Sequence, residues 1–397
     1  MIPCMTCLTG IFRPGRFIII FAALMTSGQA FPQVAGGENP QETGMAFPLI
    51  AGRENPQETV QAFPRVAGSA FPEETGQAIP QVAGRAFPRF TGRNEGGEDQ
   101  WTIVYSGEIT GKGERSTGRI IIDLIFGKSK LSLNKPMGIT SGEGYMWVIN
   151  QGDGNVLRME DNRAMLPPAI RRTKTSFPSL VGITKTDSGS ILFTDSKLNK
   201  IFSLSADGRE LNEFNPGLAL NQPTGIAFSS KYREIWIVET ASHRITVTDM
   251  HGNTIRQLGG RGTGKGEFNY PTSVWIDSQG IAYVVDALNF RVQIFDHKGR
   301  FINAFGKQGD ATGSFARPKG IATDSYGHIY ITDALFNAVQ VFDNEGNLLY
   351  YFGTQGSDHG QFWMPSGIYI DERNNIYIAD SYNSRVQIFK PERRSQR

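Results

Sequence analysis

An acidic side chain recurs once in each of five sequence repeats in the C-terminal part of the chain. The acids are Asp195, Glu239, Asp286, Asp333 and Asp380, and a sixth repeat has Asn150 at this position. Five residues further on, the chain has Lys200, Arg244, Arg291, Ala338 and Arg385, with Asn155 in the sixth repeat. Acids and cations at this spacing can form ion pairs, whereas a ring of carboxylates can bind calcium.

Ion pairing is the interpretation we favour for these acids. Four of the five have a cation five residues later, and carboxylates that are already paired make poor calcium ligands. Each would also cap the turn that it begins. Asp333 alone has no cation partner, because Ala338 stands in its place. Asp333 is therefore the weak candidate for a metal or substrate ligand. We assign no other metal ligand and no catalytic residue, and we expect no cofactor.

The repeats that carry these residues predict the fold. Three of them begin at Pro271, Pro318 and Pro365, which lie 47 residues apart, and each alternates apolar with polar residues. A period of this length is typical of a propeller blade, which is one sheet that needs neighbours to bury its faces. The sequence contains six such repeats. It therefore predicts an all-β, six-bladed propeller over residues 98–397.

Each blade should contain four antiparallel strands, here called a to d. In blade 4 they are predicted at Ser273–Asp277, Ala282–Asp286, Arg291–Asp296 and Arg300–Phe305. Blade 6 lacks a fourth strand, because the chain ends after the third. Residues 118–128 match residues 299–307, so we expect an N-terminal d strand at 119–126 to close the ring. Trp101–Ile109 is a further strand without an assigned place.

The repeat resembles a known family. The pattern D-x-x-x-x-R-V/I-x-V/I-F is followed by FG-x-x-G-x-x-x-G-x-F-x-x-P-x-G, for example from Phe305-Gly306 to Pro318 and Gly320. This resembles the NHL repeat, most closely in blades 3 to 6. The resemblance implies a module that in most cases binds protein and in some binds RNA. Related six-bladed propellers include lyases and lactonases that hold zinc or calcium.

The histidines do not predict a zinc site. A catalytic zinc needs three converging protein ligands. Of the five histidines, only His243 and His359 are expected at the end of the propeller formed by the b–c turns and d–a loops. They belong to separate blades, and His243 is most simply a turn residue.

Apolar residues at the predicted turn tips depart from the family pattern, which has small polar residues there. They are Leu288, Phe290, Leu335, Phe336 and Tyr382 in the b–c turns, and Tyr270 and Trp363 in the neighbouring d–a loops. Contiguous exposed apolar surface usually marks a binding site for a partner. We interpret these seven residues as a protein-binding face. The alternative is that some fold inward, Trp363 first among them.

The N-terminal part of the chain divides into a leader and a stalk. Arg13 and Arg16 precede the apolar run Phe17–Met25, and Ser27–Ala30 follows. This order is typical of a secretory signal peptide, with cleavage expected after Ala30, and the run is too short to span a membrane. The only cysteines, Cys4 and Cys7, lie inside this leader.

Eight octads such as AFPRVAGS follow the leader, with a proline in each. So few apolar residues cannot offset the entropy of ordering, so residues 31–97 are predicted to be a disordered, flexible stalk. The stalk is either a spacer, which we favour, or an array of short binding motifs.

These features predict a function class. We expect a secreted or periplasmic, non-catalytic, protein-binding scaffold with a monomeric propeller. The alternative is a lactonase- or lyase-type enzyme with a metal in the central channel. The chain has 40 Lys and Arg against 38 Asp and Glu. Nucleic-acid binding is not expected, because it usually requires a clear basic surplus.

Overall fold

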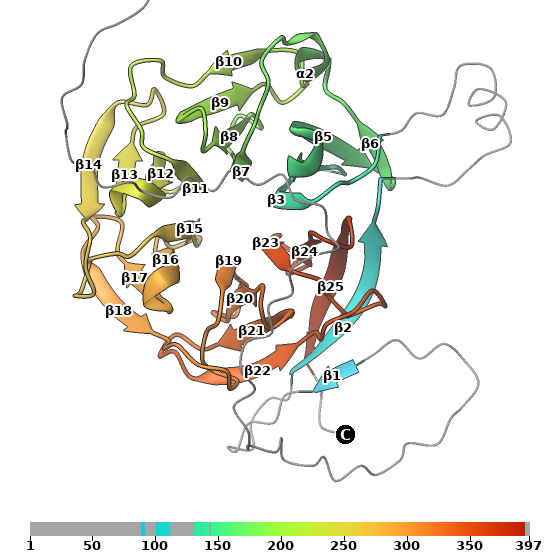
Figure 1. Cartoon of the computed structure of the whole chain (residues 1–397), viewed down its shortest axis with the longest axis vertical. Helices are drawn as coiled ribbons and strands as arrows, with labels where there is room; N and C mark the ends of the chain where they lie inside the picture. Colours follow the sequence, from blue (N-terminus) through green and yellow to red (C-terminus); the bar gives the residue numbers. More distant parts are fainter. Residues whose placement is uncertain (1–88, 92–100, 112–130, 143, 394–397) are drawn as a thin grey trace, which may run out of the picture. The chain divides into compact units, whose positions relative to one another are not determined.

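Six antiparallel β-sheets surround a common axis (Figure 1). The structure is a computed structural model, and it describes residues 89–91, 101–111, 131–142 and 144–393. The predicted leader, all of the stalk except Arg89–Thr91, and the predicted closing strand 119–126 lie outside the described residues. Among the described residues, no helix has the length and apolar character that a membrane crossing requires.

The strands follow the predicted a-b-c-d order in every blade. Blade 1 consists of β3 (Pro136–Ser141), β4 (Met146–Asn150), β5 (Asn155–Glu160) and β6 (Arg163–Met165). Blade 2 consists of β7 (Leu180–Lys185), β8 (Ile191–Asp195), β9 (Lys200–Leu204) and β10 (Leu211–Glu213). Blade 3 consists of β11 (Pro223–Ser229), β12 (Glu234–Glu239), β13 (Arg244–Thr248) and β14 (Thr254–Gly259).

Blades 4 to 6 repeat this arrangement. Blade 4 consists of β15 (Pro271–Ile276), β16 (Ala282–Asp286), β17 (Arg291–Phe295) and β18 (Phe301–Phe305). Blade 5 consists of β19 (Pro318–Thr323), β20 (Ile329–Asp333), β21 (Ala338–Phe342) and β22 (Leu348–Phe352). Blade 6 consists of β23 (Pro365–Ile370), β24 (Ile376–Asp380), β25 (Arg385–Arg393), β2 (Trp101–Ile109) and β1 (Arg89–Thr91). The six-bladed all-β prediction is confirmed.

The core of the protein lies between neighbouring blades. The b strands β4, β8, β16 and β20 are buried along their whole length. One core cluster joins Val238 and Ile245 of blade 3 to Val274 and Val284 of blade 4. Each sheet therefore buries both faces, which explains why the inner strands have apolar residues at successive positions. In blade 1, the outer strand β6 is short and is followed by the helix α2 (Pro168–Arg172).

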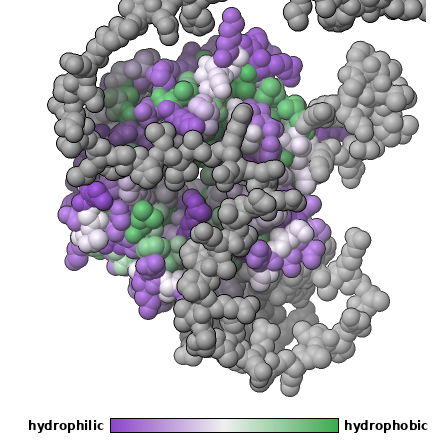
Figure 2. Space-filling view, viewed as in Figure 1, coloured by the Kyte–Doolittle hydropathy of each residue, from purple (hydrophilic) through white to green (hydrophobic). Residues whose placement is uncertain are grey.

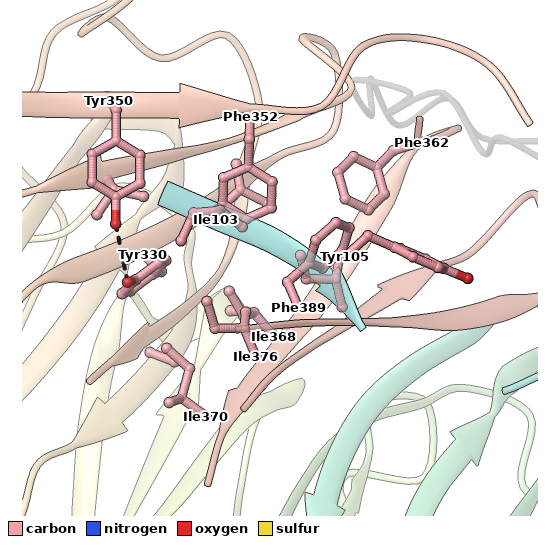
Figure 3. Close-up of a cluster of buried hydrophobic side chains, with 14 residues drawn as sticks. Ile103, Tyr105, Tyr330, Tyr350, Phe352, Phe362, Ile368, Ile370, Ile376 and Phe389 are labelled. Carbon is pink, nitrogen blue, oxygen red and sulfur yellow. Dashed lines mark hydrogen bonds between the residues drawn. The ribbon is translucent and has the colours of Figure 1, made fainter. Parts of the chain in front are cut away.

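The ring is closed by β2, which pairs antiparallel with β25 from Trp101↔Arg393 to Ile109↔Val386. Ile103 and Tyr105 of β2 pack into a buried cluster that includes Phe352 and Phe389 (Figure 3). An N-terminal closing strand was predicted, but assigning it to 119–126 was wrong, because Trp101–Ile109 occupies the edge of blade 6. Residues 118–128 resemble the d strand of blade 4 in sequence, but this resemblance does not show which segment reaches the edge of blade 6.

Blade 6 also extends into the predicted stalk. Arg89–Thr91 belongs to the last octad, yet it forms β1 and pairs antiparallel with β2. The prediction of a fully unstructured stalk is therefore wrong for these three residues, because β2 offers them an edge with free hydrogen-bonding groups.

A glycine in the a strand sets how closely neighbouring blades approach. It recurs as Gly138, Gly182, Gly225, Gly320 and Gly367, and blade 4 has Ser273 instead. A Cβ atom on Gly320 would lie 2.6 Å from the carbonyl oxygen of Ser366 in the next blade. On Gly225 it would lie 2.7 Å from the Cα atom of Ser273. The absence of a side chain therefore lets the a strands pack backbone to backbone around the axis.

Gly320→Ala should lower the free energy of unfolding by about 1–3 kcal/mol, the usual cost of overpacking. The added methyl group would collide with the backbone of β23. Ser273→Ala is the matched control, because this position already carries a Cβ atom and should tolerate alanine. Urea unfolding followed by circular dichroism measures both. Equal stability of the two variants would contradict the packing argument.

Ile103→Ala should cost about 2–5 kcal/mol of unfolding free energy, because it empties a buried site in the closing strand. Val104→Ala, at a partly exposed neighbouring position of β2, should cost about 1 kcal/mol or less. Thermal unfolding of both variants is the measurement. If Ile103→Ala unfolds like the wild type, β2 does not close the ring.

Candidate functional site

The b–c turns and d–a loops lie together at one end of the propeller, which we call the upper end. The fourth residue of each b–c turn has a left-handed backbone. These residues are Gly154, Asn199, His243, Phe290, Asn337 and Ser384, with φ between 52° and 60°. This conformation reverses the chain in a single turn, as in the 3₁₀ turn Ala287–Asn289 (η3). The second residue of the turn therefore lies at its tip.

Backbone hydrogen bonds fix these tips to the loops beside them. The N–H of Leu288 donates to the carbonyl of Asn269 at 3.0 Å, and that of Tyr382 to the carbonyl of Trp363 at 3.1 Å. The N–H of Ala334, next to Leu335, donates to the carbonyl of Arg317 at 3.0 Å. The upper end is therefore a set of short, mutually bonded turns.

His243 is a turn residue, as predicted. Its Nδ1 accepts a hydrogen bond of 3.1 Å from the N–H of Tyr270 in the loop leading to the next blade. Asn199 and Asn337 accept equivalent bonds from Gln222 and Met364, both at 2.8 Å. His243 thus provides the acceptor that asparagine provides in blades 2 and 5.

The described part of the chain contains no group of three His, Cys, Asp or Glu side chains that could hold a metal. His359 stacks on Tyr105 of the closing strand, with ring centroids 4.6 Å apart. The described residues therefore offer no zinc site at the upper end.

Three of the four predicted ion pairs form. Glu239–Arg244 is 2.7 Å long, and Asp286–Arg291 and Asp380–Arg385 are each 2.8 Å long, with fully buried carboxylates. The predicted pair Asp195–Lys200 was wrong, because Lys200 pairs with Glu213 of β10 at 2.5 Å. Asp195 instead accepts hydrogen bonds from the N–H groups of Ser179, Lys197 and Leu198.

Arg385 also helps to close the ring. It pairs with Glu108 of β2 at 3.0 Å as well as with Asp380. Burial is the largest influence on the Asp380 carboxyl and raises its pKa. The N–H of Trp363, the amide of Asn383 and Arg385 act in the opposite direction. Through these contacts, Asp380 stabilises its turn and the neighbouring loop.

Asp333, the weak metal candidate, has its carboxylate surrounded by backbone donors. The N–H groups of Ala316, Arg317, Leu335 and Phe336 all donate to it, over 2.8 to 3.3 Å. The side chain is fully buried. Its place in the structure is that of a turn cap, in which amide groups replace the missing cation.

The seven predicted binding residues divide into two groups. Phe290 and Phe336 are partly buried. The other five have exposed fractions of 40% for Tyr270, 52% for Leu288, 55% for Leu335, 49% for Trp363 and 50% for Tyr382. We call these five the apolar arc. The inward folding considered for Trp363 does not occur.

The apolar arc spans blades 4 to 6 at the upper end. Trp363 and Tyr382 contact each other, with ring centroids 5.6 Å apart, and the Lys135 ammonium lies 5.4 Å from the Tyr382 ring centroid. Blades 1 to 3 have Gly152, Lys197 and Ala241 at the corresponding turn tips. On the face shown in Figure 2, hydrophobic residues form separate groups within a largely hydrophilic surface.

Side-chain hydrogen bonds join the blades around the upper rim of the channel, and sequence reasoning missed them. Gln151 Nε2 donates to Leu180 O at 2.9 Å, Thr194 Oγ1 to Thr224 O at 2.7 Å, and Thr240 Oγ1 to Pro271 O at 2.7 Å. Thr332 Oγ1 donates to Ser366 O at 2.5 Å, and Ser381 Oγ to Pro136 O at 2.7 Å. These bonds cover five of the six joints between blades.

The joint between blades 4 and 5 differs from the others. Val285 and Ala287 stand where the other blades have these donors, and neither side chain can donate a hydrogen bond. The described residues make no equivalent bond at this joint. The signal in the sequence is the combination of Val285 and Ala287, since blade 5 has Ala334 at the second position but keeps its donor, Thr332, at the first.

Thr240→Val should destabilise the protein by about 1–3 kcal/mol, because it leaves the buried Thr224 hydroxyl and Pro271 carbonyl without their partner. Thr272→Val is the matched control at the joint between blades 4 and 5. It should leave stability unchanged or raise it slightly, because the buried Thr272 Oγ1 has no hydrogen-bond partner within the described part of the chain. Urea unfolding compares the two. Equal losses in both variants would contradict the role given to the rim bonds.

Comparison with known proteins agrees with this architecture. Residues 362–389, in blade 6, match the family model described as NHL repeat. No curated protein matches the sequence.

Solved structures of other propellers resemble this chain at low identity. An auxiliary nutrient binding protein from Bacteroides thetaiotaomicron is 14% identical, with a TM-score of 0.54, and the match covers 74% of this chain and 77% of that one. A gluconolactonase from Xanthomonas campestris is 14% identical, with a TM-score of 0.53, covering 80% of this chain and 99% of that one. Virginiamycin B lyase from Staphylococcus aureus is 17% identical, with a TM-score of 0.47, and the match covers 65% of this chain and 95% of that one.

The two structures with TM-scores above 0.5 show the fold alone at these identities, and one fold can have different functions. The family match and the six-sheet arrangement agree with the repeat pattern of the sequence. The chain is a six-bladed β-propeller whose sixth blade matches the NHL repeat.

Proposed function

We propose that this protein is a secreted or periplasmic, non-catalytic scaffold that binds a protein partner through the apolar arc. The observation that carries the proposal is the set of five half-exposed apolar side chains on three adjacent blades. Exposed apolar surface of this kind is rarely kept unless it meets a partner.

The composition and rigidity of the apolar arc support a protein contact. Trp and Tyr are the side chains that most often dominate the binding energy of an interface. Here, Trp363 and Tyr382 pack against each other on backbone that is hydrogen-bonded across the loop. Little conformational entropy is lost when such a pre-ordered surface binds.

The chemistry of the channel favours this proposal over a metal-dependent lactonase or lyase. Its lining includes Lys185 and Lys319 together with glycines, hydroxyls and apolar side chains. Lysine ammonium groups repel a divalent cation, whereas calcium requires a shell of oxygen ligands.

The secreted or periplasmic location rests on the leader sequence around Phe17–Met25. Because Cys4 and Cys7 lie within this leader, cleavage after Ala30 would leave a mature protein without thiols. N-terminal sequencing of protein from a culture fraction tests this part separately, and an N-terminus upstream of Phe17 would contradict it.

The binding proposal is tested by capture from envelope and culture fractions on the immobilised chain, with quantitative mass spectrometry. The triple variant Leu288→Ser, Leu335→Ser, Tyr382→Ser should lose at least about tenfold of the captured partner, because it removes most of the exposed apolar area of the arc.

The matched control is Ile302→Ser with Tyr351→Ser, which changes equally exposed apolar residues on the outer strands β18 and β22. The control should capture the partner as the wild type does. Capture that is equal in the triple variant, or lost in the control as well, would remove the arc as the binding surface. A wild-type chain that captures nothing would contradict the function itself.

A further inference from the structure

The channel along the propeller axis contains a cavity of about 470 Å³ lined by the a strands of all six blades. This volume is within the range of sites that bind small molecules. The second residue of each a strand lies near the upper end. These residues are Met137, Val181, Thr224, Thr272, Lys319 and Ser366. Thr224, Thr272, Lys319 and Ser366 therefore make the upper end of the cavity more polar than its middle, which is lined by isoleucines.

Thr272 lacks the partner that its counterparts have. The hydroxyl of Thr224 bonds to that of Thr240 in its own blade, and the hydroxyl of Ser366 bonds to that of Ser381, both at 2.7 Å. In blade 4 the corresponding residue is Ala287. Thr272 Oγ1 is consequently buried without a hydrogen-bond partner among the described residues. Such a group has an unused capacity to bind a polar atom.

Lys319 occupies the same level of the neighbouring strand β19. Lys319 follows Pro318, the first residue of β19. This strand lies at the joint between blades 4 and 5, where the side-chain hydrogen bond of the other joints is missing among the described residues. No carboxylate of the described part of the chain pairs with the Lys319 ammonium group. Burial lowers the pKa of Lys319, and the nearby charge of Arg317 lowers it further. A partly buried cation beside a second cation is stabilised by an anion.

The middle of the cavity is apolar, and the lining near its lower end includes Thr140, Thr184 and Lys185. The lining of the middle includes Ile183, Ile226, Val274, Ile321 and Ile368. Near the lower end, the rings of Trp275 and Tyr369 meet with centroids 5.9 Å apart. A hydrogen bond of 2.9 Å from Trp275 Nε1 to Thr323 Oγ1 holds the indole ring in place. The cavity thus combines a cationic, hydroxyl-bearing end with an apolar interior.

We propose that this channel binds a small organic anion. Its carboxylate or phosphate group contacts Lys319, and the Thr272 side chain rotates to turn its buried hydroxyl toward the same group. Its apolar body lies against the isoleucines and the Trp275 ring. The site is separate from the apolar arc and does not depend on a protein partner. It uses the two groups that the joint between blades 4 and 5 leaves without a partner.

Isothermal titration calorimetry on the full chain tests the proposal with three matched probes. Phenylbutyrate supplies a carboxylate, phenylbutyl phosphate supplies a phosphate, and phenylbutanol supplies the same apolar body without charge. At least one anionic probe should bind, and at least about tenfold more tightly than the alcohol, as expected for hydrogen bonds to a charged group. The comparison of the two anions identifies the preferred headgroup.

Variants then locate the anion. Lys319→Met keeps the length of the side chain and should weaken binding of the anionic probe at least about tenfold, without affecting phenylbutanol. Thr272→Val should weaken it by about threefold to tenfold. Lys185→Met is the matched control, because Lys185 lines the same cavity at the opposite end of a strand, and its affinity should stay within about twofold of the wild type.

Thermal unfolding checks the fold of each variant. Lys319→Met should unfold at a temperature no lower than the wild type, because it removes an unpaired, partly buried charge. Equal binding of alcohol and anions would overturn the proposal. So would the absence of any binding, or an anion affinity that depends on Lys185 but not on Lys319.

Discussion

The backbone contact between neighbouring a strands is the constraint on which the rest of the propeller depends. Glycine at the third position of five a strands removes the side chain that would separate them, and the neighbouring backbone fills the space. Because the strands meet this closely, hydroxyl and amide side chains at the ends of the b strands can reach the next blade. Blade spacing at the axis therefore sets both the size of the channel and the hydrogen bonds around its rim.

The turns of blades 4 and 5 contribute neighbouring residues to both candidate sites. Ala287 and Leu288 are consecutive residues of one turn, and Ala334 and Leu335 are consecutive residues of the next. The alanines stand where Thr240 or Ser381 donates to a neighbouring blade, and the leucines are exposed at the tips. The two positions act separately, because in blade 6 Ser381 keeps its hydrogen bonds beside the exposed Tyr382.

The buried acids show how far local spacing predicts contacts. A cation five residues after the acid lies directly opposite it on the neighbouring strand, as in Glu239↔Arg244 and Asp380↔Arg385. Arginine at this position reaches back to the acid, so these pairs were predictable. Lys200 also lies opposite its acid, yet it binds Glu213 on β10. Blade 6 also has an acid on its outer strand, Glu108, but Arg385 binds both Glu108 and Asp380. Lys200 binds only Glu213, and Asp195 accepts hydrogen bonds from amide groups instead. A spacing rule cannot weigh such competition, because it depends on what the outer strand carries.

The six blades, their strand order, the turn positions and the residues at the turn tips could all be predicted from the amino-acid sequence. These follow from a repeat period and an alternation that are local properties of the chain. The pairing of β25 with Trp101–Ile109 instead of 119–126 became clear only from the folded chain. The same holds for the exposure of Trp363 and for the position of Thr272 and Lys319 along the channel, where no described residue pairs with their polar groups. Each of these depends on contacts between segments distant in sequence, where burial and available partners select among locally similar candidates.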